Sequence, residues 1–138
     1  MPSIHINNLD HYYEQTDHGP PLVCVHGAFA DARIWGPQWK YFSTKYQPLR
    51  YDLRGHGRTG ASDLARYSMA TYADDLSVLL DAIGIRSAIL CGLSWGGSII
   101  QALAVRSPGL PEALILAGTA VSINLTLLDK LLCYGLFP

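Results

Sequence analysis

Short apolar runs that alternate with segments of helical periodicity are the feature that most constrains how this chain can fold. The runs cover residues 22–25, 49–52, 88–91 and 113–116, and three of the four are continuously apolar. Runs of this length and composition are typical of strands that are buried on both faces of a parallel sheet. Because helical segments lie between them, the sequence predicts an α/β fold with a doubly wound, mostly parallel sheet.

The clearest helix is expected over residues 68–83. Its apolar side chains recur at helical spacing and form one stripe, which consists of Tyr72, Leu76, Leu79, Leu80 and Ile83. Ser68 or Thr71 can cap the start of this helix, and Gly84 supplies the stop.

Three further elements complete the predicted architecture. One helix is expected over residues 37–46, and another from residue 95 to the residue before Pro108. Residues 4–6 and 12–14 flank a polar turn, and this pattern predicts an antiparallel hairpin at the N-terminus.

Length, charge and cysteine content exclude several classes of protein. The 138 residues suffice for one domain, and the 10 basic and 11 acidic residues are interspersed, so no nucleic-acid or membrane partner is predicted. The N-terminus lacks a secretory signal pattern, and no apolar run approaches the roughly 20 residues of a spanning helix. Three widely spaced cysteines predict neither a disulfide framework nor a metal site, and as reduced thiols they indicate a cytoplasmic protein.

A glycine-rich turn joins the third apolar run directly to a helix. It is Gly92-Leu93-Ser94-Trp95-Gly96, followed by Gly97. So abrupt a reversal forces Ser94 into a strained backbone conformation, and the neighbouring positions must be glycine because strand and helix backbones nearly touch there. The turn exposes the Ser94 hydroxyl beside the unpaired N–H groups of the new helix. The motif therefore predicts a nucleophilic serine at the carboxyl edge of the sheet.

A second motif, His26-Gly27-Ala28-Phe29, follows the first apolar run. Acyl transfer requires two N–H donors aimed at the developing oxyanion. The Trp95 N–H is expected to supply one and the Ala28 N–H the other, with Gly27 allowing the loop to pass close. His26 is expected to be a hydrogen-bonded structural residue rather than a catalytic base, because it lies at a strand end and precedes the serine.

The third motif, Asp52-Leu53-Arg54-Gly55-His56-Gly57, follows the second apolar run. We expect a tight structural turn in which Asp52 accepts hydrogen bonds from loop N–H groups and Arg54 pairs with a carboxylate. Residues 55–60 also match the dinucleotide fingerprint G-x-G-x-x-G. That fingerprint requires a helix to begin at once and an acidic residue about 20 positions on, at the end of the next strand. The sequence offers neither, so no nucleotide cofactor is predicted.

In this order and spacing, the three motifs resemble those of the α/β-hydrolase fold family, most closely its small cytoplasmic esterases, lactonases and cofactor-free haloperoxidase-like members. The resemblance extends from the N-terminal hairpin to residue 116. It implies that Ser94 is the nucleophile, that the backbone N–H groups of Ala28 and Trp95 form the oxyanion hole, and that the Phe29 and Trp95 side chains border an acyl pocket. Family members with an aspartate nucleophile, such as epoxide hydrolases and haloalkane dehalogenases, are disfavoured by the serine. No metal or organic cofactor is implied.

The chain departs from the family pattern after the proposed nucleophile. The family order is nucleophile, acid, histidine, whereas all five histidines precede Ser94 and the only later carboxylates are Glu112 and Asp129. Glu112 is expected at the start of a strand, the wrong end of the sheet, and Asp129 is expected to face solvent from a Leu-rich segment. Without a general base a serine is poorly activated, so the isolated 138 residues are expected to be almost inactive.

The resemblance implies that residues 1–123 are the N-terminal part of a hydrolase domain, truncated before the last strands and the cap. Residues 124–138 would then begin a helical cap or an interface segment. The run 113–116 is left as an uncovered sheet edge, which favours pairing with another chain. Two explanations stay open: a truncated hydrolase, which the intact motifs favour, and a half-domain that needs a partner.

The sequence is compatible with two functions. The first is a serine hydrolase that acts on a carboxylic ester, a lactone or a similar small acyl substrate, with the acid and the histidine of the triad outside this chain. The second is a non-catalytic binding or interaction module. Such a module would dock a partner chain, or a second copy, through the uncovered edge and the Leu-rich segment.

Overall fold

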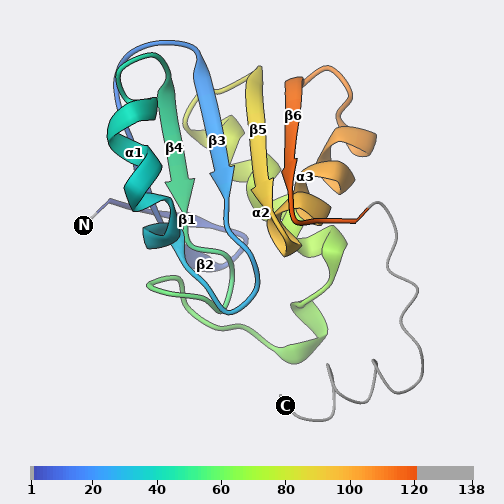
Figure 1. Ribbon diagram of the computed structural model, residues 1–138. Helices are drawn as coiled ribbons and strands as arrows, with labels where there is room; N and C mark the ends of the chain where they lie inside the picture. The colour runs from blue at the N-terminus through green and yellow to red at the C-terminus, as the bar shows by residue number, and fades with distance from the viewer. Residues whose placement is uncertain (1, 121–138) are drawn as a thin grey trace.

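A computed structural model describes residues 2–120 of the chain. Six strands form one sheet in the order β1-β2-β4-β3-β5-β6 (Figure 1). They are β1 (Ser3–Ile6), β2 (Leu9–Gln15), β3 (Pro21–Val25), β4 (Gln47–Tyr51), β5 (Ala88–Leu93) and β6 (Pro111–Ala117). The strand β2 pairs antiparallel with both β1 and β4, whereas the pairs from β4 through β3 and β5 to β6 are parallel. The predicted mostly parallel sheet with an N-terminal antiparallel hairpin is confirmed.

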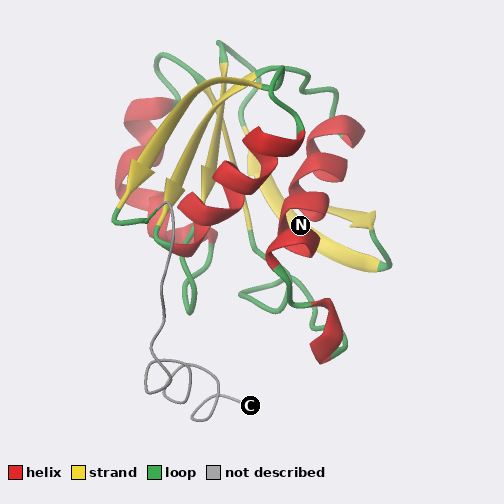
Figure 2. Cartoon of the chain, turned by 90° about the vertical axis from the view of Figure 1, so that its right-hand side faces the viewer, coloured by secondary structure: helices red, strands yellow, loops and turns green. Residues whose placement is uncertain are grey.

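Helices cover both faces of this sheet, so the fold is doubly wound as predicted. Two short 3₁₀ helices, η1 (Ala32–Trp35) and η2 (Leu64–Arg66), accompany three α-helices: α1 (Gly36–Phe42), α2 (Met69–Ala82) and α3 (Trp95–Arg106). Figure 2 shows α1 on one face of the sheet and α2 with α3 on the other.

The buried side chains form two clusters, one on each face. The larger cluster joins α2 and α3 to the sheet and includes the predicted stripe residues Tyr72, Leu76, Leu79 and Leu80. The smaller cluster, on the α1 side, consists of Leu22, Cys24, Trp35 and Cys91. Removing this apolar surface from water stabilises the layers by about 25 cal/mol per Å².

The ends of α2 agree with the local signals in the sequence. Ser68 is the N-cap, and its hydroxyl oxygen accepts a hydrogen bond from the N–H of Thr71 at 3.1 Å. Gly84 follows the helix with a φ of 80°, the left-handed conformation that commonly terminates helices. The N-terminal hairpin turns at Asn7 and Asn8, whose φ values of 49° and 60° suit a two-residue turn with both central residues left-handed.

Two expectations require correction. The helix predicted over residues 37–46 ends at Phe42. The N–H groups of Thr44 and Lys45 donate to carbonyls three residues back instead of four, and the hydroxyls of Ser43 and Thr44 donate to the carbonyls of Trp39 and Tyr41. Hydrogen bonds of this local kind compete with continuation of the helix.

The apolar run 113–116 was expected to be buried on both faces, yet its side chains are exposed. Leu114, Ile115 and Leu116 retain 38%, 48% and 42% of their accessible surface. The strand β6 lies at the end of the described sheet, where it pairs on one side with β5. That this edge stays uncovered is still a prediction.

No helix in residues 2–120 is both long enough and apolar enough to cross a membrane. The segment 124–138, with Asp129 and Cys133, lies outside the described residues.

Candidate active site

Ser94 occupies a strained turn at the carboxyl end of β5. Its φ and ψ are 51° and −115°, a conformation that costs a residue with a side chain of order 1–3 kcal/mol. Its backbone N–H donates to the Ala117 carbonyl at 2.8 Å, and its carbonyl accepts from the Gly97 N–H at 2.9 Å. Ser94 is therefore the N-cap of α3 rather than a residue inside the helix, and it is exposed.

Glycines permit this turn because three backbone segments meet there. A Cβ atom placed on Gly92 would lie 2.6 Å from the carbonyl carbon of Gly96 and from Cα of Gly97. A Cβ on Gly96 would overlap the carbonyl oxygens of Val25 and His26 at the end of β3. Each added Cβ atom would lie closer to backbone atoms than any ordinary contact, so only glycine fits at positions 92 and 96.

The loop after β3 passes close to Ser94. A Cβ atom placed on Gly27 would lie 3.3 Å from the Ser94 Cβ and 3.9 Å from its Oγ. Ala28, the next residue, is exposed, and Trp95 begins α3. The N–H groups in the first turn of a helix have no intrahelical acceptor. The two backbone donors expected for an oxyanion thus belong to the segments that flank the Ser94 hydroxyl.

A cavity of about 350 Å³ opens beside Ser94. The residues that line it come from the start of α3 and from the segment after β6: Ser94, Trp95, Ser98, Gly118, Thr119 and Ala120. The Gln101 side-chain amide donates to the carbonyls of Gly97 and Ala120 at 3.1 and 3.3 Å. This bridge holds one wall of the cavity against α3.

The two aromatic residues expected at the pocket are placed differently. Trp95 lines the cavity, and its ring also meets the Tyr72 ring edge-on, with centroids 6.1 Å apart. Phe29 adopts a φ of 61°, is 82% exposed and is not among the residues that line the cavity. A role for Phe29 beside the substrate stays a prediction.

The sequence reasoning missed three residues of this cavity region. Ser98 and Gln101 follow Ser94 by four and seven positions, so helical spacing alone could have placed them on the same side of α3. Thr119 follows β6, and its hydroxyl lies 3.5 Å from that of Ser98. No local pattern marked Thr119, because its position depends on the pairing of β6 with β5.

Both ring nitrogens of His26 are engaged with the backbone. The side chain is fully buried, Nε2 accepts from the Leu53 N–H at 3.0 Å, and Nδ1 lies 2.7 Å from the Gly27 carbonyl. Because an amide N–H can only donate, the proton of the neutral ring is assigned to Nδ1. Burial lowers the pKa of His26, and the neighbouring His56 lowers it further. His26 therefore links two loops and has no nitrogen left for Ser94.

Asp52 organises the turn that follows β4. Its fully buried carboxylate accepts hydrogen bonds from the N–H of Ala32 at 2.7 Å and from the N–H and Nε of Arg58, both at 2.8 Å. Burial alone would raise the pKa of Asp52, but the bonds from Arg58 and Ala32 outweigh it and lower the pKa. Gly57 has a φ of 53°, and a Cβ on it would lie 2.7 Å from Cγ of Asp52. Gly55 is also left-handed, with a φ of 73°.

The other nucleophilic side chains near this edge are unsuited to catalysis. Burial, and secondarily Cys91, raise the pKa of the Cys24 thiol to about 12, so it stays protonated at neutral pH. Burial raises the pKa of Cys91 as well. Within residues 2–120 no three His, Cys, Asp or Glu side chains are grouped closely enough to hold a metal ion.

Comparisons with known proteins agree with this geometry. The family model described as "alpha/beta hydrolase fold" matches residues 20–131. The chain is 34% identical over 105 residues to 3-oxoadipate enol-lactonase 2 of Acinetobacter baylyi, a match that covers 76% of this chain and 39% of the relative. It is 31% identical over 107 residues to epoxide hydrolase 4 of Homo sapiens, covering 76% of this chain and 30% of the relative.

A solved structure shows the same arrangement of elements. The enol-lactonase from Burkholderia xenovorans superposes with a TM-score of 0.82 at 32% identity, over 86% of this chain and 47% of the other. This chain spans about two fifths of the length of its curated lactonase relative. The matched family, the shared topology and the strained serine turn lead to one conclusion: the chain belongs to the α/β-hydrolase fold family.

Proposed function

We propose that this chain carries the nucleophile and the oxyanion hole of a serine hydrolase for a carboxylic ester, a lactone or a similar small acyl compound. The backbone conformation of Ser94 carries the proposal. A φ of 51° at the junction of β5 and α3 holds the hydroxyl at the carboxyl edge of the sheet, beside the Gly27 loop. Strain of this kind persists only where the surrounding structure imposes it.

The proposed reaction begins with attack of Ser94 Oγ on the acyl carbon of the substrate. The carbonyl oxygen becomes negative as the tetrahedral intermediate forms, and the N–H groups of Ala28 and Trp95 donate to it. Each such donor is worth about 2.7–4 kcal/mol of transition-state stabilisation in a comparable site. The alcohol or lactone oxygen then leaves, and water hydrolyses the acyl-serine ester.

Proton transfer requires a base that the described residues do not place at Ser94. Both ring nitrogens of His26 are bound to backbone groups, and Nδ1 of His56 lies 2.9 Å from the Arg54 carbonyl. We therefore propose that an acid–histidine pair from outside this chain completes the triad. The 138 residues alone should turn over ester substrates at a negligible rate.

The lining of the cavity and the relatives both support the proposed substrate class. Two hydroxyls, from Ser98 and Thr119, and the ring of Trp95 surround the space beside Ser94. A compact acyl group with a polar substituent suits such a lining. Enol-lactonases share the fold and about a third of the matched residues, and lactones present the ester carbonyl that this site would attack.

A fluorophosphonate probe tests the nucleophile. In the protein expressed from its complete reading frame, the probe should label Ser94, and the labelled residue can be identified by peptide mass spectrometry. Ser94→Ala should abolish labelling. Ser98→Ala is the matched control, because Ser98 lines the same cavity one helical turn away, and it should keep the label. Labelling that survives Ser94→Ala, or no labelling of the wild type, contradicts the proposal and favours a non-catalytic binding module.

A further inference from the structure

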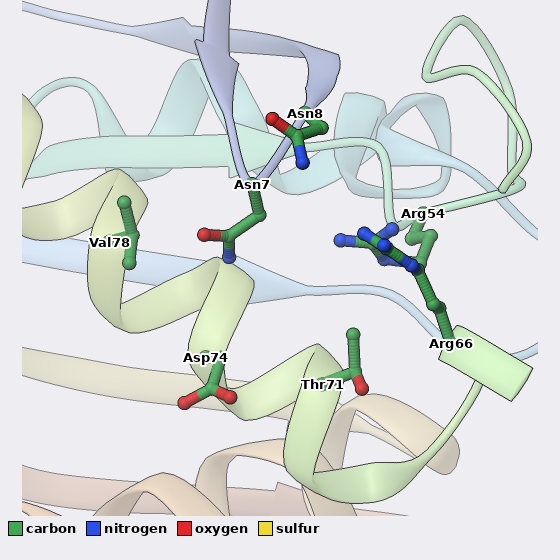
Figure 3. Close-up of a pocket in the computed structure, with 7 residues that line it drawn as sticks. All are labelled: Asn7, Asn8, Arg54, Arg66, Thr71, Asp74 and Val78. Atoms are coloured by element: carbon green, nitrogen blue, oxygen red, sulfur yellow. The ribbon is translucent and has the colours of Figure 1, made fainter.

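A second pocket lies on the α2 side of the sheet and shares no lining residue with the cavity at Ser94. Its volume is about 420 Å³, and Figure 3 shows the side chains around it. They come from the β1–β2 turn, from the segment after β4 and from α2: Asn7, Asn8, Arg54, Arg66, Thr71, Asp74 and Val78. Two guanidinium groups therefore face one pocket.

The charge of Arg54 is already compensated inside the protein. Its Nε and Nη2 donate to the two oxygens of Asp75 at 2.8 and 2.7 Å, and both side chains are only 2% exposed. The Asn7 amide also donates to Asp75, at 2.8 Å. These bonds leave the third guanidinium nitrogen, Nη1 of Arg54, without a hydrogen bond within residues 2–120.

Arg66 is the uncompensated charge of the pocket. It is exposed, and its side chain forms no ion pair among the described residues. The carboxylate of Asp74 also lines the pocket, but it pairs with Arg106. With Arg54 balanced by Asp75 and Arg106 balanced by Asp74, one positive charge remains.

We propose that this pocket binds the carboxylate group of a small molecule between Arg54 and Arg66. Arg66 can donate two parallel hydrogen bonds to the carboxylate and Arg54 can donate one from Nη1, because its other nitrogens bind Asp75. Charge-assisted bonds of this kind are roughly twice as strong as neutral ones. The Asn8 amide offers a further donor, and the Val78 side chain, 38% exposed, offers apolar contact for a short aliphatic stem. A single negative charge matches the single surplus positive charge.

The presence of Asp74 selects a monocarboxylate over a more highly charged anion. A second negative charge on the ligand would lie in the same pocket as the Asp74 carboxylate. Like charges at short range repel more strongly where the protein partly excludes water. Phosphate dianion should therefore bind more weakly than a short aliphatic monocarboxylate.

Titration with sodium butyrate, followed by amide chemical shifts of the whole chain, tests the proposal. Saturable shifts are expected at Asn8 and Thr71, with no comparable change at Ser98. Sodium phosphate at equal ionic strength should bind several-fold more weakly, and sodium chloride should produce no saturable shift. The proposal is overturned if chloride produces the same saturable shifts as butyrate, or if phosphate binds more tightly than butyrate.

Single variants identify the residue that is responsible for butyrate binding. Arg66→Gln should weaken butyrate binding at least tenfold, and Arg66 is exposed, so its loss should leave the fold intact. Arg33→Gln is the matched control, because Arg33 is an exposed arginine that already pairs with Asp31, and it should keep the wild-type affinity. Asp74→Asn should strengthen binding several-fold, because it removes a negative charge from the lining of the pocket. The proposed site is contradicted if Arg66→Gln and Arg33→Gln bind butyrate equally well, or if Asp74→Asn binds butyrate more weakly than the wild type.

Discussion

Arg54 and Asp75 form a two-point ion pair in the interior, 21 positions apart in the sequence, with both side chains 2% exposed. The pair joins the loop after β4 to α2. Removing one partner of a buried pair leaves an uncompensated charge, which costs about 3–5 kcal/mol. We expect Arg54→Met to lower the free energy of unfolding by about that amount, as measured by urea denaturation.

An exposed pair provides the control for this prediction. Arg86 and Asp81 also pair, but their side chains are 75% and 63% exposed. Arg86→Met should change the free energy of unfolding by about 1 kcal/mol or less. The double variant Arg54→Met/Asp75→Leu should recover most of the loss, because it removes both buried charges. Equal losses in the two single variants would refute the argument.

The serine turn should not tolerate a methyl group at position 92. Gly92→Ala places a Cβ 2.6 Å from the backbone of Gly96 and Gly97, so β5 and α3 must separate. We expect a loss of about 1–3 kcal/mol in the free energy of unfolding and loss of fluorophosphonate labelling at Ser94. In Gly109→Ala the added Cβ meets nothing within 4 Å, so this variant should stay within about 0.5 kcal/mol of wild type. Equal losses of unfolding free energy in Gly92→Ala and Gly109→Ala would contradict the close approach of β5 and α3.

The buried His11 should make stability depend on pH. Burial lowers its pKa, Arg54 lowers it further, and Asp75 and Asp10 oppose the change. Because the folded pKa lies below the unfolded value of 6.5, the unfolded state binds more protons in the window between the two. Stability from this group is therefore complete above pH 6.5 and falls as the pH drops through that window, by at most about 1.4 kcal/mol per pH unit.

Urea denaturation at pH 7.5, 6.5 and 5.5 measures this dependence. His11→Gln should flatten the change in unfolding free energy below pH 6.5, and the buried His26, whose pKa is also lowered, should account for part of the remaining slope. His18→Gln replaces an exposed histidine and should preserve the wild-type slope. An unchanged slope in His11→Gln would show that His11 does not cause it.

The β6 edge should cause the 138-residue chain to self-associate. Ile115 is 48% exposed on a strand at the end of the described sheet, where backbone groups are open to pairing with a second copy. A charge on an edge strand opposes such pairing, so Ile115→Lys should increase the monomer fraction measured by light scattering. Val105→Lys alters an apolar side chain on α3 that is 84% exposed, and it should not change the fraction. A wild type that is monomeric, or equal effects of both variants, would contradict the prediction.

Local signals predicted the elements of this fold well and the extent of α1 poorly. The Ser68 cap and the left-handed Gly84 act within one turn of α2, so a reader of the sequence can find them. At the end of α1, N–H groups bond three residues back instead of four, and the hydroxyls of Ser43 and Thr44 bond to nearby carbonyls. These residues can also lie within helices, so their presence alone did not mark the end.

In the candidate site, too, local sequence predicted some features and missed those that depend on long-range packing. The spacing of glycines around Ser94 indicated a sharp strand-to-helix turn, and the structure has that turn. The cavity wall formed by Thr119 could not be inferred, because it depends on the register of β6 against β5. The ligand pocket at Arg66 was equally hidden, since it combines a hairpin turn with a helix more than 60 positions away.

The amino-acid sequence was enough to predict the order of strands and helices, the residues of the serine turn and the family resemblance. Each of these depends on residues that are neighbours along the chain. Three other features came from the packed fold: β4 lies between β2 and β3, Asp75 is the partner of Arg54, and His26 is bound at both nitrogens. These contacts join segments far apart in sequence, and their energies depend on burial, which exists only once the layers have packed.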